Sequence, residues 1–524
     1  MTLVASSCTD VLDQMPTTED TSKDVYAEAA NYKRVLAKIY ASYVLAGQGQ
    51  GGDNGDLTSI NKQEFSRGYF NLQEAATDEV ANTWLSGNNL SDLTYISWDA
   101  KDSWVSDSYH WLFFNIALCN EFLRHCSDEE IARFSEAEQT EIRTFRSEAR
   151  FMRSFSYWMV LDLYRQGPKV DENTPVTGYI PEAYDGIGMF DFIESELKEL
   201  VAEGVSSALP ATNEYGRASK PVAWALLARL YLNSAVYRGN VDTKYYTECI
   251  TACKQVISNS AFYLEPEYAK LFNADNHKRT HEILFAMVCD ATTSVTWGGG
   301  TYIICGSCGN SSTQDPAKYG LSNGWGMFRA RGEMTAKFGD IATTKDSRAM
   351  FYTDGQAQFF TGAIDNQAEG YFFEKFSNLT DEGVAASNSA ATGCSTDYPL
   401  LRLADIYLMA AEAQLRGGTG LSRTEALELV NKVRLRAYNQ DESGKISDSD
   451  FTLDFILDER ARELYLESVR RTDLIRFNKF VSADYIWQWK GGVLDGRAVN
   501  KKYNIYPIPD TDLTANPNLH NPLY

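Results

Sequence analysis

Long stretches of the chain place apolar residues every three or four positions, the spacing that gathers them on one face of an α-helix. Within 24–46 the recurring positions are Val25, Ala29, Tyr32, Leu36, Ile39 and Tyr43. The same period predicts further helices over 103–126, 137–165, 189–203, 218–237, 243–259, 400–416, 422–438 and 451–470. The sequence therefore predicts a mostly α protein whose helices pack as pairs, as in tetratricopeptide repeats.

The pattern changes in the region of about 290–395, which is rich in Gly, Ser, Thr and Asn and has few long stretches of periodic apolar residues. A short strand is expected over 371–376, and 484–524, with four prolines, is expected to be irregular. No Pro/Gly/Ser-rich linker separates the two helical parts. We therefore expect one domain over 24–524, with 290–395 as an irregular insertion in the helical array.

Residues 1–23 precede this domain and contain Ala5-Ser6-Ser7 directly before Cys8. Small residues before a cysteine resemble the end of a bacterial lipoprotein signal, in which the cysteine is acylated. We read 1–23 as a signal remnant and linker with Cys8 as the lipidation site, the alternative being an unstructured terminus with a chance cysteine. Since no window approaches 18 consecutive apolar residues, a lipid anchor is the membrane attachment expected.

The charge balance narrows the classes of ligand that the protein can bind. The 524 residues include 49 Lys+Arg and 71 Asp+Glu, a net charge of −22, whereas nucleic-acid binding requires a basic surface and anionic membranes attract basic segments. Cys305-x-x-Cys308 has no second cysteine pair, and His277-x-x-x-His281-Glu282 has no evident third ligand. No metal and no cofactor is predicted.

The aromatic content, with 30 Tyr and 10 Trp, suits a neutral polar ligand such as a sugar, although a large helical core also uses many aromatics. Trp297 precedes three glycines and Trp325 lies between Gly324 and Gly326, so both are poor candidates for core positions. Six other tryptophans are expected in the structural packing: Trp104, Trp111, Trp158 and Trp224 on helical stripes, and Trp487 and Trp489 near the C-terminus.

Several longer motifs carry a family resemblance. They are EARFMRSFSYWMVLDLY at 148–164 followed by Gly167-Pro168, GRASKPVAWALLARLYL at 216–232, PLLRLADIYLMAAEA at 399–413, DERARELYLE at 458–467, and Tyr506-Pro-Ile-Pro509. In this order they resemble the SusD/RagB family, and the resemblance covers nearly the whole chain. It implies four tetratricopeptide-like units supporting an irregular ligand-binding face. It also implies a non-catalytic, lipid-anchored glycan-binding protein on the outer-membrane cell surface of Bacteroidetes, partnered with a SusC-like TonB-dependent transporter.

Within that family the sequence is most similar to its starch-binding member, whose site is an arc of aromatic rings that follows the curve of an α-glucan. By this resemblance Trp297 stands where the arc has a Tyr, Trp325 matches an arc Trp, and Arg67 matches a polar contact. Two positions depart, since Asn82 replaces an arc Trp and Gly87 a contacting Asn. Their neighbours Trp84 and Asn88 are our candidates to compensate.

Two of the polar candidates also have an interpretation in which they bind no ligand. Asp56, in a Gly-rich loop, is a candidate acceptor for sugar hydroxyls, and the alternative is a solvated turn. For Arg67 the alternative is a surface ion pair.

The sequence thus predicts capture of oligosaccharides, foremost a starch-like α-glucan, and their delivery to the transporter. Three alternatives stay open. The first is another neutral glycan such as dextran or fructan, the second a glycoside hydrolase on a helical scaffold, and the third a scaffold that binds a peptide or protein, including a structural lid of the transporter.

Overall fold

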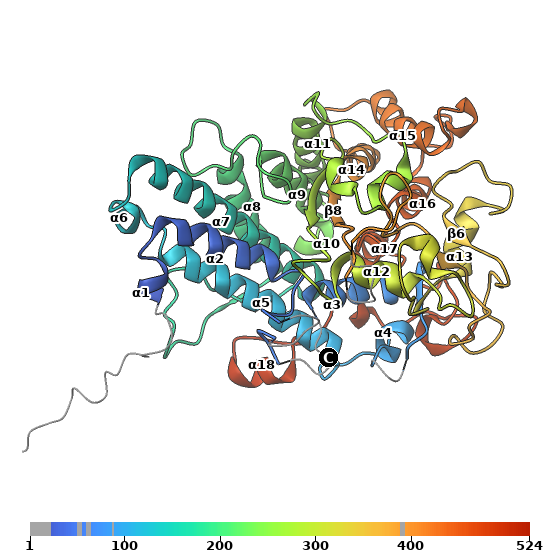
Figure 1. Cartoon of the computed structure of the whole chain (residues 1–524), viewed down its shortest axis with the longest axis horizontal. Coiled ribbons are helices and arrows are strands. Elements are labelled where there is room, and N and C mark those ends of the chain that lie inside the picture. Colours follow the sequence, from blue (N-terminus) through green and yellow to red (C-terminus); the bar gives the residue numbers. More distant parts are fainter. Residues whose placement is uncertain (1–21, 50–54, 59–63, 86–88, 388–392) are drawn as a thin grey trace, which may run out of the picture.

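The computed structural model describes residues 22–49, 55–58, 64–85, 89–387 and 393–524. Its main feature is an array of helices in which each helix packs against the next (Figure 1). The array comprises α2 (Ala29–Ala41), α5 (Ser103–Arg124), α7 (Glu136–Tyr164), α8 (Gly186–Val201), α9 (Lys220–Leu232), α11 (Thr243–Ile257), α14 (Leu403–Leu415), α15 (Arg423–Ala437) and α16 (Leu453–Leu464). The predicted mostly α architecture, built from paired helices, is confirmed.

The longest helix, α7, shows why these segments fold as predicted. It begins at a capping box, in which the Ser135 hydroxyl accepts from the Glu138 N–H and the Glu138 carboxylate accepts from the Ser135 N–H. It ends where Arg165 adopts a left-handed conformation just before Gly167-Pro168. Its C-terminal half is almost wholly buried between α5 and α8.

Three predicted helices are each divided in two. The segment 24–46 becomes α1 (Ser22–Val25) and α2, and 218–237 becomes α9 and α10 (Ser234–Arg238). The segment 451–470 becomes α16 and α17 (Arg470–Arg476), because Leu466 and Ser468 take positive φ angles of 61° and 58°. Glu467 lies between them and accepts from the buried Arg402 and Lys375. The ion pairs of this buried cluster stabilise the break between α16 and α17, and hydrophobic periodicity gives no sign of them.

Short antiparallel ribbons complete the fold. β4 (Ile283–Met287) pairs with β8 (Tyr398–Arg402), so the helix expected from residue 400 begins at Leu403. The strand expected over 371–376 is present as β7 (Phe372–Phe373), paired with β6 (Phe351–Tyr352). The remaining ribbons are β1 (Val80–Asn82) with β5 (Phe328–Ala330), and β2 (Gly167–Pro168) with β3 (Ala183–Tyr184).

Several helices occupy positions that periodicity did not predict. α3 (Phe65–Phe70) continues into a π-helical turn over Asn71–Ala75, and α12 (Gly299–Ser307) lies within the region expected to be irregular. All nine residues of α12 are buried. A Cβ at Gly300 would lie 2.0 Å from the Thr396 carbonyl oxygen, so glycine permits this close approach. The smaller helices are α4 (Ser91–Tyr95), α6 (Asp128–Ile131), α13 (Gly332–Thr335) and α18 (Asp510–Ala515).

The tryptophans expected in the structural packing all lie in or against the core. Trp104, Trp111, Trp158 and Trp487 are buried, and Trp224 and Trp489 are half-buried against apolar clusters.

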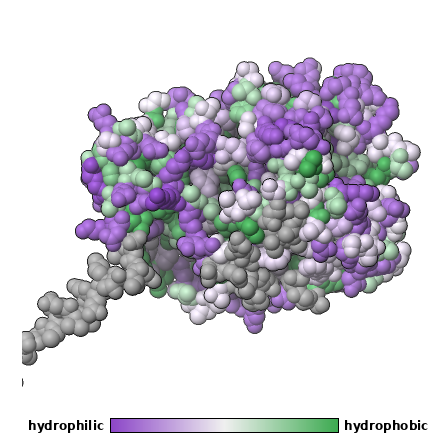
Figure 2. Space-filling view, in the orientation of Figure 1, coloured by the Kyte–Doolittle hydropathy of each residue, from purple (hydrophilic) through white to green (hydrophobic). Residues whose placement is uncertain are grey.

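The outer surface is largely polar, since Figure 2 shows a face dominated by hydrophilic residues with only small hydrophobic patches. In the described part of the chain, no helix has the length and apolar character needed to cross a membrane.

Candidate functional site

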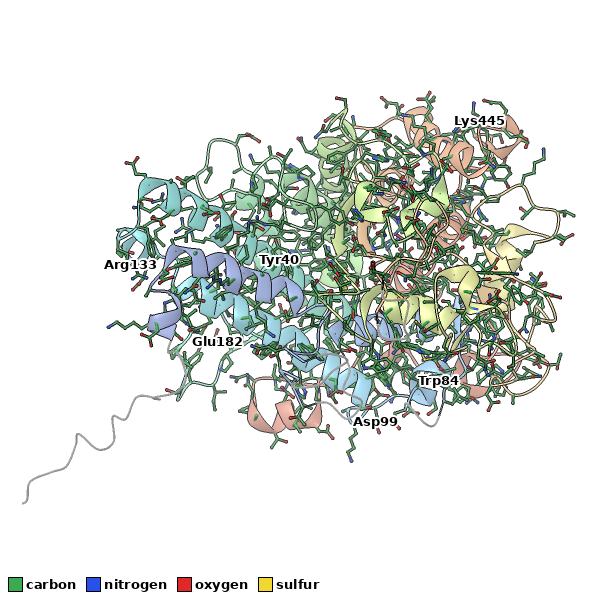
Figure 3. The ribbon with its side chains drawn as sticks, in the orientation of Figure 1. Tyr40, Trp84, Asp99, Arg133, Glu182 and Lys445 are labelled. Carbon is green, nitrogen blue, oxygen red and sulfur yellow. The ribbon has the colours of Figure 1, made fainter. Side chains whose placement is uncertain are left out.

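Three tryptophans singled out from the sequence lie in one row. The Trp325 ring centroid is 5.8 Å from that of Trp297, with an interplanar angle of 42°, and 6.5 Å from that of Trp84, with an angle of 34°. Trp84 is 38% exposed, and the other two rings are half-buried. Figure 3 shows Trp84 close to α4, well away from Tyr40 of α2. We call the row Trp297–Trp325–Trp84 the aromatic platform.

The central ring is held by the backbone of α12. The Trp325 N–H donates to the Cys305 carbonyl at 2.7 Å, and the Gly326 N–H donates to the Cys308 carbonyl at 2.7 Å. Carbonyl groups at the C-terminal end of a helix lack intrahelical hydrogen-bond partners, and here the N–H groups of Trp325 and Gly326 donate to them. The flanking Gly324 is required by space, because a Cβ there would lie 2.2 Å from the Gly309 carbonyl oxygen.

Trp84 is placed beside Trp325 by the β1–β5 ribbon. Asn82 pairs with Phe328 in that ribbon, and the Thr83 N–H donates to the Met327 carbonyl at 2.9 Å. The Asn82 side chain is buried and accepts from the Trp84 N–H at 2.9 Å. Asn82 therefore supports the backbone of the neighbouring tryptophan and presents no ring of its own.

Trp297 is held by a buried acid that the sequence interpretation did not single out. The Trp297 N–H donates to Glu64 Oε1 at 3.0 Å, and the Thr296 hydroxyl donates to the same oxygen at 3.2 Å. Glu64 directly precedes α3 and is fully buried. Because 233 positions separate Glu64 from Trp297 in the chain, no local sequence signal connects them.

Arg67 is connected to the platform through Tyr302 and Glu64. Its guanidinium carbon is 5.1 Å from the Tyr302 ring centroid and 5.6 Å from that of Trp104, and its Nη1 lies 3.4 Å from Glu64 Oε2. The Tyr302 ring is in turn 6.2 Å from that of Trp325. Arg67 is thus paired with a buried carboxylate that also holds Trp297, and its role as a sugar contact stays a prediction.

The remaining predicted site residues are not assembled with the platform by any described contact. The Asp56 carboxylate forms an ion pair with Lys38 of α2, and its N–H donates to the Ala46 carbonyl at 2.8 Å. Asn88 and Cys8 lie outside the described residues.

Metal-binding groups are not gathered anywhere in the described ranges, where no set of three or more His, Cys, Asp or Glu side chains is arranged around a common point. His281 stacks on Tyr263 at 4.2 Å between centroids and contacts Glu265 at 3.1 Å. Cys305 and Cys308 are both buried at the end of α12.

Chemically, the platform offers flat apolar faces with hydrogen-bonding groups beside them. Tryptophan rings bury apolar area while the indole edge remains polar, and a guanidinium supplies donors in a fixed planar geometry. Such a surface suits a ring-shaped ligand with an apolar face and a polar rim.

The fold and platform together define a helical-repeat scaffold with an aromatic surface on its irregular side. The chain belongs to the SusD family: the sequence model of that family matches residues 281–524, and the chain is 31% identical to the Starch-binding protein SusD of Bacteroides thetaiotaomicron over 93% of this chain and 90% of that one. It is also 26% identical to SusD-like protein P25 of Formosa agariphila, covering 79% and 77% of the two chains.

Two solved structures with a similar fold are a SusD superfamily protein from Parabacteroides distasonis and Surface glycan-binding protein A from Bacteroides thetaiotaomicron in complex with laminarihexaose. The first has a TM-score of 0.70 at 20% identity, with coverage of 97% of this chain and 100% of that chain. The second has a TM-score of 0.69 at 17% identity, with coverage of 93% and 97%. The resemblance to the SusD/RagB family expected from the motifs is therefore confirmed.

Proposed function

We propose that this protein binds oligosaccharides on the aromatic platform without cleaving them, and delivers them to a SusC-like TonB-dependent transporter at the cell surface. The single observation that carries the proposal is the contiguous row of Trp297, Trp325 and Trp84. It is supported by a relative named for starch binding and by a fold neighbour solved with laminarihexaose.

The platform geometry sets the expected strength of binding. Stacking one sugar ring on a tryptophan removes about 100 Å² of apolar surface, which contributes about 2.5 kcal/mol at roughly 25 cal/mol per Å² before ordering costs. Two or three stacked rings then give about −4 to −8 kcal/mol, or millimolar to micromolar dissociation constants. Binding of this strength allows fast release to a transporter.

A starch-like α-glucan is the ligand we favour. The planes of neighbouring platform rings are turned by 42° and 34°, so a bound chain must curve to place successive sugars on successive rings. α-1,4-Glucans curve in this way, and the starch-binding relative supports the same choice. Dextran and fructan are the competing neutral glycans.

The absence of catalysis is part of the proposal, and the surroundings of Glu64 support it. Glycoside hydrolysis needs two carboxyl groups flanking the scissile bond, about 5–9.5 Å apart. The carboxylate that the described contacts place at the platform is Glu64, which is buried and occupied by Trp297, Thr296 and Arg67.

Attachment through a lipid on Cys8 would hold the protein at the outer membrane, where a transporter partner lies. This part of the proposal is tested by mass spectrometry of the protein recovered from membranes, which should show an acylated Cys8. A protein recovered wholly without acyl groups would contradict it.

The decisive experiment is calorimetry against maltoheptaose, isomaltoheptaose and a fructan oligosaccharide, with wild type, Trp325→Ala and Trp224→Ala. Trp224 is a half-buried tryptophan on α9 and serves as the matched control. We expect maltoheptaose to bind best, Trp325→Ala to weaken it about tenfold or more, and Trp224→Ala to leave it unchanged. Binding of none of the glycans, equal loss in both variants, or release of reducing sugar would contradict the proposal.

A further inference from the structure

Glu64 joins the Trp297 end of the platform to Arg67 through a single side chain. We propose that Glu64 is the positioning residue of the glycan site, with one carboxylate oxygen fixing the Trp297 end of the platform and the other holding Arg67 against Tyr302. This inference rests on the proposed function and names a residue that touches no sugar.

The first oxygen, Oε1, organises the loop that carries Trp297. It accepts from the Trp297 N–H at 3.0 Å and from the Thr296 hydroxyl at 3.2 Å. The same hydroxyl reaches the Val44 carbonyl at 3.0 Å, and the Gly299 N–H donates to the Ser66 hydroxyl at 2.9 Å. Residues 64 and 66 therefore anchor the backbone on both sides of Trp297.

The second oxygen, Oε2, faces Arg67 Nη1 at 3.4 Å. The guanidinium lies over Tyr302 and Trp104, and its Nε has no hydrogen-bond partner among the described residues. Arg67 is therefore held by the charge of Glu64 and by two aromatic faces. Removal of that charge leaves Arg67 only its contacts with Tyr302 and Trp104.

These two tasks can be separated by substitution. In Glu64→Gln the amide oxygen can still accept from Trp297 and Thr296, but the negative charge that holds Arg67 is lost. In Glu64→Ala both functions are lost. A residue that merely fills space would not separate the variants in this way.

Lowering the pH should remove the charge of Glu64, as Glu64→Gln does. Burial raises the pKa of Glu64, while Arg67 and the hydrogen bonds from Trp297 and Thr296 oppose the rise. The charged and titratable groups facing Glu64 are Arg67 and the Tyr302 hydroxyl. As the pH falls toward the raised pKa, Glu64 takes up a proton and releases Arg67, so affinity should fall in acid for wild type and stay level for Glu64→Gln.

The test is a double-mutant cycle with maltoheptaose, using Glu64→Gln, Glu64→Ala and Arg67→Ala alone and in combination. We expect Glu64→Gln to weaken binding about fivefold in wild type and not at all in Arg67→Ala, because the two changes remove the same interaction. Glu64→Ala should weaken binding further even in Arg67→Ala. Equal loss from Glu64→Gln in both backgrounds, or a wild-type pH profile in Glu64→Gln, would overturn the inference.

Two further measurements keep the result independent of the ligand and of stability. Crystal structures without glycan should show Arg67 displaced from Tyr302 in Glu64→Gln while Trp297 stays in place, and both displaced in Glu64→Ala. Unmoved side chains would refute the positioning role even if maltoheptaose does not bind, whereas failure of binding alone would count against the proposed function. The stability control is Glu412→Gln, a buried carboxylate of α14 paired with Arg416 and Arg476, which should lower stability and leave affinity unchanged.

Discussion

Replacement of Gly324 by alanine tests whether backbone packing sets the position of the platform's central ring. The added Cβ would lie 2.2 Å from the Gly309 carbonyl oxygen and 2.4 Å from that of Cys308. A carbon normally stays about 3.4 Å from such an oxygen, so the segment must move by about 1 Å. Both obstacles are backbone atoms that cannot rotate away.

The consequence can be estimated from the two hydrogen bonds that flank the substitution. They join Trp325 N to Cys305 O and Gly326 N to Cys308 O, both at 2.7 Å. A shift of about 1 Å lengthens them beyond the normal range, and each contributes about 1 kcal/mol. With overpacking included, we expect a loss of about 1–3 kcal/mol in the free energy of unfolding.

Binding should weaken as well, because Trp325 moves relative to both neighbouring rings. Urea unfolding and calorimetry with maltoheptaose measure the two effects on the same protein. The control is Gly362→Ala, at an exposed position where an added Cβ meets no atom within 4 Å. If Gly324→Ala unfolds and binds like Gly362→Ala, the argument that close approach of backbones sets the Trp325 position is wrong.

Three further outcomes are expected. Arg402→Ala should lower the free energy of unfolding by about 3–5 kcal/mol in urea titrations, because buried Glu282, Glu463 and Glu467 all lose a partner. Burial disfavours the charged form of Glu412, but Arg476 and Arg416 outweigh it and lower the pKa of this carboxyl to about 2. The ionised carboxylate therefore contributes about 3 kcal/mol to the free energy of unfolding above pH 4.5, and this contribution is lost as the pH falls toward 2. Glu412→Gln should flatten the dependence of the free energy of unfolding on pH in that range. Trp84→Ala should weaken maltoheptaose binding less than Trp325→Ala and leave the unfolding temperature unchanged, since Trp84 ends the row and is the most exposed of its rings.

Periodicity located most closely the helices that have one exposed and one buried face. The stripes of α5, of the N-terminal half of α7 and of α11 alternate with polar positions, so the ranges of these helices follow from the sequence to within a few residues. By contrast, α12 is buried on every side and rich in glycine, and therefore carries no polar face to set a period. The same reason hides β8, whose five residues are all buried and merge with the apolar start of α14.

For the site, the local sequence identified the tryptophans of the platform but not the residues that hold them in place. Tryptophans beside glycines, such as Trp297 and Trp325, are conspicuous because such segments rarely pack large rings into a core. Glu64 and Tyr302 carry no such mark. Their roles arise from contacts between 64–67 and 296–302, segments more than two hundred positions apart that only the tertiary fold brings together.

The way in which the three rings are held bears directly on affinity. Each platform tryptophan has its backbone N–H fixed before any ligand arrives: Trp325 by Cys305, Trp84 by Asn82, and Trp297 by Glu64. Ordering a side chain on binding costs about 0.5–1.5 kcal/mol, a cost that a preformed surface avoids. Three loosely held rings would therefore lose much of the roughly 2.5 kcal/mol that each stacked sugar contributes. It follows that substitution of Asn82 or Glu64, two fully buried side chains that accept from these N–H groups, should reduce affinity, by less than removal of a ring does.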